Sequence, residues 1–410
     1  MSQPPNGGRK RRVLIIVVNL PVPFEKRVWH EATTLVSAGY EVSVICPTGR
    51  DGLERHEVLD GVHIYRHPMP LEASGAAGYL VEYASALVWE LWLSLRIFAT
   101  RGFDVIQACN PPDLIFLVAA PYKLLGRRFV FDHHDLCPEL YVAKTGHRGP
   151  FWQLLRISER LTFALADLVI STNESYRRLA MQRGHKRPEQ VFVVRNGPNL
   201  KRVRPGPALE ALKGGRRHLV GYVGLIGEQE GIQYLLQAAR HIVHVRGRTD
   251  IGFAIVGEGP ALAQLRELSR ELGVDQFVRF TGHVTDAELF AILNTADVCV
   301  NPHEYNELND KSTMNKIMEY MAIGKPIVQF DGTEGRHSAQ EASLYARRND
   351  SVDFGEKILE LLADPERRLR MGAIGQARVQ HELAWVHQAP KLLAAYETLF
   401  SAPERAPATA

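Results

Sequence analysis

Two side chains near residue 316 have the types and spacing that suit a nucleoside diphosphate. Lys316 and Glu319 are three residues apart in a stretch that reads as loop, helix, Gly324 and strand, so both lie on one helix face. The lysine there can neutralise phosphate charge, and the carboxylate can accept hydrogen bonds from ribose hydroxyls. Ser312 or Thr313 can cap this helix, whose first backbone N–H groups form an anion site. The alternative interpretation is an ordinary ion pair on a surface helix.

This stretch and a series of further motifs resemble glycosyltransferase family 4, the retaining nucleotide-sugar transferases of GT-B fold. The segment KxxEYMAxGKPIV at 316–328 is similar to the family's donor-site helix. The other landmarks, in chain order, are FEKRV at 24–28, Glu31-Ala32, DHHD at 132–135, Pro138-Glu139, Asn196-Gly197, Gly224 with Gly231, GEGP at 257–260 and FTG at 280–282. Each motif alone is weak evidence, whereas their order and spacing over most of the chain are specific.

The resemblance implies that the C-terminal half binds the donor and that Glu319 holds its ribose. The further donor-binding residues that we predict are Gly224, Gly227, Gly257, Glu258, Ser312, Thr313, Asn315 and Lys316. One position departs from the family pattern, because Lys311 stands where the first glutamate of the E-x7-E pair is expected. Glu307 and Asp310 are close enough in sequence to substitute for it.

A second departure concerns the loop that begins at Gly224. Leu225 and Glu230 stand where many family members carry an arginine and a lysine that reach the diphosphate. The glycines still permit close backbone approach to phosphate oxygens. We therefore expect Lys316 and the helix end at Ser312 to carry more of the phosphate charge.

A second group of candidates follows the apolar run FVFD at 129–132. His134 and Asp135 come at the carboxyl edge of the predicted sheet, where ligands bind in doubly wound folds. A histidine there can donate a hydrogen bond to a sugar hydroxyl or take the acceptor's proton. With Glu319, these two residues are our candidate catalytic residues. The alternative is a structural histidine that caps a turn and is fixed by Asp135.

The acceptor side is predicted to form from the loops that follow the first strands. Its candidate residues are Asn19, Arg27 and Asn110. Arg27 has two equally good interpretations. It can bind a phosphate or acidic group on the acceptor, or it can be a surface charge at the start of a helix.

Short apolar runs separated by helical patterns must position these residues. The predicted strands are 13–18, 41–46, 62–65, 104–108, 129–132, 167–171 and 191–194 in the first half, and 219–224, 253–257, 277–282, 298–302 and 326–330 in the second. Helices are predicted between most of them, including 26–38 and 152–166. Continuous apolar strands that alternate with helices indicate parallel sheets covered on both faces. We predict an α/β chain of GT-B fold, with two doubly wound Rossmann-like domains facing a central cleft.

The predicted domain boundaries follow from composition and length, since 410 residues suggest two or three domains at about 150 residues each. Residues 1–200 form an N-terminal acceptor-binding domain, and 218–384 form a C-terminal donor-binding domain. Between them, 201–217 is rich in Pro, Gly and basic residues and is predicted as a linker. Residues 385–410 are predicted as a helix that packs back on the N-terminal domain, followed by a disordered tail.

Composition excludes a disordered protein, a collagen-like fibre and a coiled coil. The hydrophobic share of 45% and charged share of 23% are those of a globular chain. A net charge of +3 does not indicate a nucleic-acid partner. The four cysteines have no metal spacing, and neither D-x-D nor H-x3-H is present, so we expect no metal or other cofactor. No signal peptide is apparent, and Glu82 and Glu90 interrupt the apolar stretch 76–99, so we expect a cytoplasmic protein rather than a membrane-spanning one.

The function predicted from these features is retaining transfer of a sugar from a nucleoside-diphosphate sugar to a hydroxyl. The family implies a glycan acceptor, a lipid-linked or polysaccharide precursor of cell-surface glycan synthesis. The basic start and the helix around Trp89 would then contact the inner face of the membrane. Two alternatives remain open. One is a nucleotide-sugar 2-epimerase, and the other is a catalytically degenerate GT-B module that acts as a binding or scaffold subunit.

Overall fold

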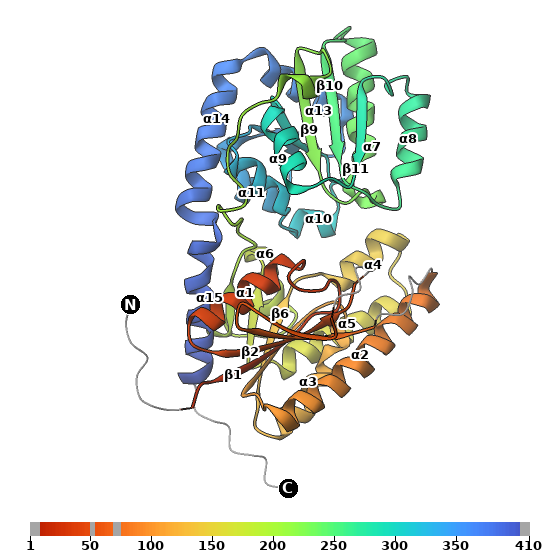
Figure 1. The fold of residues 1–410 in the computed structure, drawn as a ribbon. Helices are drawn as coiled ribbons and strands as arrows, with labels where there is room; N and C mark the ends of the chain where they lie inside the picture. The colour runs from red at the N-terminus through yellow and green to blue at the C-terminus, as the bar shows by residue number, and fades with distance from the viewer. Residues whose placement is uncertain (1–8, 50–53, 69–74, 402–410) are drawn as a thin grey trace. The chain divides into compact units, whose positions relative to one another are not determined.

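The structure, a computed structural model, describes residues 9–49, 54–68 and 75–401 (Figure 1). The tail that we predicted to be disordered lies outside these residues, beyond Ser401. The chain divides into two compact units, of which unit 1 comprises 1–195 with 388–410 and unit 2 comprises 196–387. Residues 201–217 lie within unit 2, where Gly206 N donates to Asn294 Oδ1 over 3.0 Å and Leu209 N donates to Thr295 Oγ1 over 2.9 Å.

Unit 1 is built on an eight-stranded sheet of order β3-β4-β2-β1-β5-β6-β7-β8. Its strands are β1 Arg12–Ile16, β2 Glu41–Pro47, β3 His56–Leu59, β4 Val62–His67, β5 Val105–Cys109, β6 Arg128–His133, β7 Leu168–Ser171 and β8 Val191–Val193. All neighbouring pairs are parallel except β3 with β4. The seven strands predicted in this half are confirmed. The prediction missed β3, an edge strand with mostly exposed residues and therefore no apolar run.

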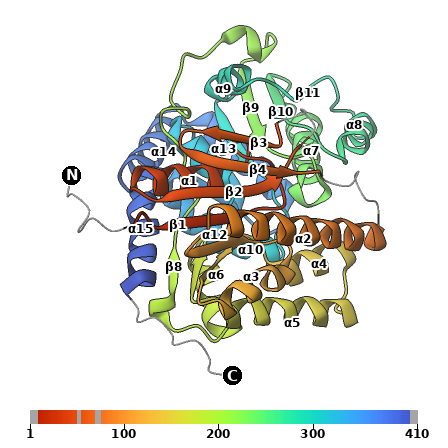
Figure 2. The same ribbon diagram turned by 60° about the horizontal axis from the view of Figure 1, so that its bottom comes forward.

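The helices of unit 1 cover both faces of this sheet. They are α1 Lys26–Ser37, α2 Gly75–Thr100, η1 Asp113–Ile115, α3 Phe116–Leu124, α4 Cys137–Thr145, α5 Pro150–Leu165, α6 Glu174–Gln182, η2 Pro188–Gln190 and most of α15 Trp385–Ser401. Figure 2 shows α2, α3 and α5 together over one face, and α3 contacts both of the others. Aromatic side chains such as Phe103, Phe129 and Phe131 fill the core beneath them.

Unit 2 repeats the architecture with a six-stranded parallel sheet of order β11-β10-β9-β12-β13-β14. Its strands are β9 His218–Val223, β10 Ile251–Val256, β11 Val278–Gly282, β12 Val298–Asn301, β13 Ile327–Phe330 and β14 Ser343–Ala346. The five strands predicted here are confirmed, and β14 is an edge strand that the prediction missed.

The helices of unit 2 pack on both sides of its sheet over three apolar clusters. They are η3 Glu210–Lys213, η4 Glu228–Glu230, α7 Ile232–Arg240, η5 His241–Val245, α8 Leu262–Glu271, α9 Asp286–Thr295, α10 Glu307–Lys311, α11 Asn315–Ala322, α12 Thr333–Ala339, η6 Gln340–Ala342, α13 Ser351–Ala363, α14 Pro365–Arg378 and η7 Val379–Leu383.

In each sheet the strand order reverses beside the first strand of the unit. In unit 1 the reversal lies between β1 and β5, and in unit 2 it lies between β9 and β12. Loops diverge at such a switch point, which leaves a crevice for ligands at the carboxyl ends of the strands. Asn19 and Asn110 follow the two unit 1 strands, and Gly224 follows β9, so topology brings these candidates to ligand-binding edges.

Candidate active site

Helix α11 is fastened to the carboxyl ends of β9 and β12 by one buried side chain. Tyr320 OH accepts a hydrogen bond from Val223 N over 2.9 Å and donates to Val300 O over 3.4 Å. Ile317 and Met321 of the same helix are buried in the core. The helix face that carries Lys316 and Glu319 is thereby held at the switch point of unit 2.

Lys316 is almost buried, with 11% of its side chain exposed, and its charge is paired. Its Nζ lies 2.9 Å from Glu230 Oε2 and donates to Tyr222 OH over 3.0 Å. Tyr222 OH in turn donates to Glu230 Oε2 over 2.9 Å, and His303 Nε2 lies 2.9 Å from the same oxygen. The predicted phosphate-binding lysine therefore belongs to a compact group of four polar side chains.

Electrostatics show that Glu230 is the ionised centre of this group. Burial would raise the pKa of Glu230, but Lys316 and His303 outweigh burial and hold that pKa well below its ordinary value. Burial lowers the pKa of Lys316, and the nearby Glu230 opposes that shift. Because Glu230 already neutralises Lys316, a diphosphate must compete for or share this ammonium.

Glu319 has a partner that lies outside every predicted motif. Arg202 NH1 is 3.2 Å from Glu319 Oε1, and the same guanidinium contacts both oxygens of Asp286 at 2.5 and 2.6 Å. Lys316 pairs with Glu230 and Glu319 with Arg202, so the alternative of a Lys316–Glu319 surface ion pair is wrong. Arg202 orients the carboxylate that we assigned to a ribose.

The predicted cap of α11 is wrong. The N-cap residue is Met314, whose side chain makes no capping hydrogen bond. Ser312 instead ends the separate short helix α10, and its Oγ donates to Leu308 O over 2.8 Å. The short helix α10 occupies 307–311, so α11 begins only at Asn315. Ser312 and Thr313 therefore lie two residues and one residue before the N-cap position of α11. The start of α11, whose N-cap residue does not cap it, points backbone N–H groups where an anion can bind.

The two acids proposed to replace the missing glutamate are both engaged. Glu307 Oε1 lies 2.8 Å from Lys311 Nζ. Asp310 accepts from Thr333 N over 2.7 Å and from Thr333 Oγ1 over 3.0 Å. Asn315, at the first turn of α11, is exposed.

The glycine loops after β9 and β10 pack backbone to backbone. Gly224 N donates to Val256 O over 3.1 Å, and Ile226 N donates to Glu258 O over 2.8 Å. At Gly257, φ is +136° and any Cβ would collide with Gly224 O, so only glycine fits there. Gly224, Gly257 and Glu258 therefore lie together at one sheet edge, as predicted for a donor loop.

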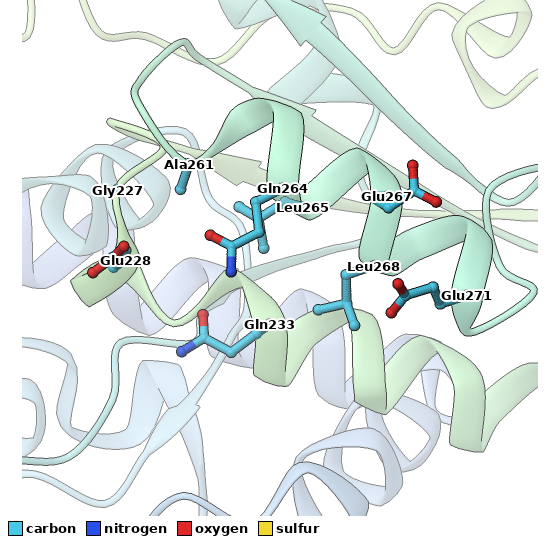
Figure 3. A pocket seen from close by; sticks show the side chains of 9 residues that line it. All are labelled: Gly227, Glu228, Gln233, Ala261, Gln264, Leu265, Glu267, Leu268 and Glu271. Atoms are coloured by element: carbon cyan, nitrogen blue, oxygen red, sulfur yellow. The ribbon is translucent and has the colours of Figure 1, made fainter.

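A cavity of about 390 Å³ lies between α7 and α8, beside this edge (Figure 3). Its lining residues are Gly227, Glu228, Gln233, Ala261, Gln264, Leu265, Glu267, Leu268 and Glu271. Of the predicted donor residues it includes Gly227 alone. A smaller hollow brings His303 and Ser312 together.

Arg27 in unit 1 is a buried structural cation, so its interpretation as a surface charge is wrong. Its side chain is 2% exposed and lies 2.8 Å from Asp132 Oδ1 and 3.2 Å from Glu31 Oε1. It also donates to Val194 O over 2.7 Å. Helix α1 presents Arg27 from its first turn, which Glu25 caps.

Asp132, rather than Asp135, fixes the imidazole of His134. His134 Nε2 lies 2.8 Å from Asp132 Oδ2 and also 2.8 Å from Arg27 Nε. One ring nitrogen cannot donate to the carboxylate and accept from the guanidinium at the same time. Donation to Asp132 leaves Nε2–H facing the N–H of Arg27, whereas acceptance from Arg27 leaves the Nε2 lone pair facing a carboxylate oxygen, so the two arrangements compete. If Nε2–H donates to Asp132, the other nitrogen of the neutral ring, Nδ1, is an acceptor.

The two buried carboxyls of this cluster differ in ionisation. Burial would raise the pKa of Asp132, but Arg27 and His134 hold it below its ordinary value. Burial and the neighbouring Asp132 raise the pKa of Glu31 well above its ordinary value. Arg27 and Asp132 thus form the charged pair, whereas the charged form of Glu31 is disfavoured.

The two asparagines predicted on the acceptor side differ in accessibility. Asn19 is exposed. Asn110 is 1% exposed; its Oδ1 accepts from His134 N over 2.8 Å and its Nδ2 donates to Asp113 Oδ1 over 2.7 Å. The structure thus shows Asn110 holding the backbone that carries His134.

Comparison with known proteins identifies the family. The model described as Glycosyltransferase Family 4 matches residues 24–202, and that described as Glycosyl transferases group 1 matches residues 217–364. The chain belongs to glycosyltransferase family 4. The enzyme is therefore a glycosyltransferase, and its two parallel-sheet units are those of the GT-B fold.

Three similar proteins show how far the likeness extends. A D-inositol 3-phosphate glycosyltransferase of Corynebacterium urealyticum is 26% identical over 300 residues, which are 68% of each chain. A GDP-mannose-dependent alpha-(1-6)-phosphatidylinositol monomannoside mannosyltransferase of Mycobacterium tuberculosis is 28% identical over 381 residues, covering 82% of this chain and 97% of its own. The solved sucrose-phosphate synthase of Thermosynechococcus elongatus has a TM-score of 0.80 at 19% identity and covers 96% of this chain and 100% of its own.

One group in the described part of the glycosyltransferase has the composition of a metal site. Cys109, Asp132 and His134 bring their ligand atoms within 4.8 Å of one another. Arg27 contacts both Asp132 and His134, so a guanidinium already fills the position that a cation would take. These residues do not fit a metal.

Several site residues of the glycosyltransferase were missed by the sequence prediction. Asp132 is two residues before His134 on the same strand edge, and Glu31 is four residues after Arg27 on one helix face, so spacing could have found both. Nothing local indicates Arg202 or His303, because their partners are distant in sequence.

Proposed function

We propose that the glycosyltransferase moves a sugar from a nucleoside-diphosphate sugar to a hydroxyl of a glycan or lipid-linked acceptor, with retention of configuration. The observation that carries the donor assignment is helix α11. Its N-cap residue, Met314, makes no capping hydrogen bond, and the helix holds Lys316 and Glu319 at the carboxyl edge of the unit 2 sheet. The donor diphosphate would bind the first turn and Lys316, and Glu319 would accept from the ribose. The relative that depends on GDP-mannose supports a nucleotide-sugar donor.

In unit 1, we propose that His134 contacts the reacting sugars, where it donates a hydrogen bond to a sugar hydroxyl or takes the proton of the acceptor hydroxyl. Its imidazole is 11% exposed and fixed from behind by Asp132. Catalysis would then consist of positioning the acceptor hydroxyl and stabilising the charge of the departing diphosphate. We propose that no metal is required, because Lys316 and the helix N–H groups supply positive charge. Activity that survives EDTA would support this part, and activity restored only by added Mg²⁺ or Mn²⁺ would contradict it.

The donor assignment is tested by ligand binding followed by transfer. UDP, GDP, dTDP and their sugars are screened for a rise in melting temperature, since a ligand of the folded state stabilises it. Glu319→Ala and Lys316→Ala are expected to lose that rise and at least tenfold in transfer rate, whereas Glu366→Ala, at a 90% exposed side chain of unit 2, is the matched control. Full activity in both site variants would overturn the assignment.

The two alternative functions have their own outcomes. The relatives named above are transferases, so they give no support to a 2-epimerase. A 2-epimerase would convert the nucleotide sugar without an added acceptor, which product analysis detects. The alternative of a degenerate binding module is motivated by the departures from the family pattern at Leu225, Glu230 and Lys311. Such a module would show no rise in melting temperature with any of the nucleotides.

We further propose that the enzyme works at the cytoplasmic face of a membrane, on a lipid-linked acceptor. The phosphatidylinositol monomannoside in the name of the mycobacterial relative supports such an acceptor. No helix in the described part of the chain has both the length and the apolar character that crossing a bilayer requires. Contact would therefore be peripheral.

The layer of α2, α3 and α5 offers the surface for that contact. Its exposed apolar side chains are Val81, Val88, Trp92, Leu95, Leu117, Leu124, Leu125, Phe151, Leu154, Ile157 and Leu161. Arg160 is exposed on α5 and Arg96 on α2, whereas the acids Glu90 and Glu159 are buried. Trp92, at 51% exposed, is better placed for lipid than the half-buried Trp89. Apolar stripes edged by arginine suit an anionic bilayer surface.

Vesicle sedimentation tests this surface. The full chain is expected to sediment with phosphatidylglycerol vesicles and much less with phosphatidylcholine vesicles. Val88→Glu with Leu154→Glu should abolish sedimentation, and Leu369→Glu, at a 75% exposed leucine of unit 2, should leave it unchanged. Equal partition with and without anionic vesicles would contradict membrane contact.

A further inference from the structure

Gln107 occupies the centre of the buried cluster behind His134. It lies on β5 and is 0% exposed. Its Nε2 donates to Glu31 Oε2 over 2.7 Å and to Asp132 Oδ2 over 3.2 Å. Both hydrogens of the amide are therefore directed at carboxyl oxygens, one of which faces His134.

The other end of that amide is held by the C-terminal helix. Tyr396 OH donates to Gln107 Oε1 over 2.5 Å, although the two residues are 289 positions apart in sequence. Tyr396 is 1% exposed, so its hydroxyl needs this acceptor. A hydroxyl that must donate to the amide oxygen fixes which end of Gln107 faces the carboxyls.

His134 has two competing arrangements. In the first, Nε2–H donates to Asp132, and Nδ1 can accept the proton of an acceptor hydroxyl. In the second, Arg27 Nε donates to Nε2, and the ring proton moves to Nδ1, which can then only donate. Both partners lie 2.8 Å from Nε2, so the position of the Asp132 carboxylate decides between them.

We infer that Tyr396, through Gln107 and Asp132, sets the tautomer of His134 and is a positioning residue of the acceptor site. With Tyr396 in place, the Gln107 amide hydrogens hold Asp132 where it accepts from Nε2–H. Without the hydroxyl, the amide is free to shift toward Glu31, to which its Nε2 already donates over 2.7 Å against 3.2 Å for Asp132. Asp132 then loses this donor and can turn away from Nε2–H, which releases the ring proton to Nδ1. The inference deepens the proposed role of His134, and it determines which of two chemical roles His134 can take.

Nitrogen NMR of the ligand-free full chain tests this inference. The protein is labelled with 15N-histidine, and the His134 signals are those that disappear in His134→Gln. The neutral imidazole is expected as the Nε2–H tautomer in the wild type. In Tyr396→Phe at least half of the population should shift to Nδ1–H. Because no donor or acceptor is used, the outcome does not depend on whether the protein transfers a sugar.

Two further variants separate positioning from general loss of a buried hydroxyl. Tyr122 is equally buried and its OH donates to Ser94 Oγ over 2.7 Å, away from this cluster, so Tyr122→Phe should keep the wild-type tautomer. Gln107→Met should reproduce Tyr396→Phe, and the double variant should equal either single one. An unchanged tautomer in Tyr396→Phe, an equal change in Tyr122→Phe, or additive effects in the double variant would each overturn the inference.

Discussion

Arg202 shows how far the proposed donor site depends on a side chain outside the recognised motifs. It joins Asp286 of α9 to Glu319 of α11. The hydrogen bond from Asp286 raises the pKa of Arg202 in spite of partial burial, and Glu319 adds to the effect. A guanidinium held by one carboxylate can orient a second, because its donors form a planar fork. Arg202 therefore sets the direction in which Glu319 meets a ligand.

This role predicts an effect on donor binding rather than on chemistry. In Arg202→Gln, Glu319 loses its fixed orientation, and we expect the KM for the donor to rise about tenfold, or about 1.4 kcal/mol, with kcat within twofold. Initial rates over a range of donor concentrations measure both quantities. Arg204→Gln, at an exposed arginine two residues further along, is the matched control. A lowered kcat at constant KM would instead indicate that Arg202 makes an interaction that exists only in the transition state.

Helix α2 illustrates the cost of a polar group inside an element. Glu90 is fully buried, and neither carboxyl oxygen has a hydrogen-bond partner in the described part of the chain. Burial raises the pKa of Glu90 to about 8. The unfolded chain binds its proton at about 4.3, so this group's stabilisation is complete below that pH and is lost as pH rises to about 8.

Replacing Glu90 should therefore remove a pH dependence. We expect Glu90→Gln to melt close to the wild type at pH 4.5 and at a higher temperature at pH 8, with a gain on the order of 5 kcal/mol in the free energy of unfolding. Glu82→Gln, on the partly exposed side of the same helix, should change little at either pH. Thermal unfolding at the two pH values decides, and a stability difference that does not grow with pH would contradict the buried, protonated state.

Sequence alone could predict most of the strands and helices of the fold. The twelve predicted strands are all present because buried parallel strands read as continuous apolar runs. Edge strands β3 and β14 escaped, since an edge needs no such run. In the site, sequence placed Lys316 and Glu319 on one face of α11, but it could not show that Glu230 and Arg202 neutralise them. Those pairings join residues 86 and 117 positions apart, and side-chain spacing carries no information over such distances.

The two units are not consecutive in sequence, because a segment that follows unit 2 belongs to unit 1. Residues 388–401 of α15 follow all of unit 2 in sequence and belong to unit 1. Leu392, Tyr396 and Leu399 of this segment are at most 4% exposed, and Arg11 and Tyr40 stack on Phe400. The stability of unit 1 should therefore depend on a helix that follows unit 2 in sequence.

Leu392→Ala tests this arrangement at the level of the whole chain. The variant opens a cavity in a fully buried position, which should cost about 3 kcal/mol. Amide hydrogen exchange is expected to rise in β1, β5 and β6 of unit 1, while β9 and β12 of unit 2 keep their protection, because exchange reports the stability of each cooperative unit. Val386→Ala, at a 66% exposed valine of the same helix, should leave both units unchanged. If protection were lost in unit 2 instead, α15 would stabilise unit 2, and the Tyr396 contact to Gln107 would not be a stable feature of unit 1.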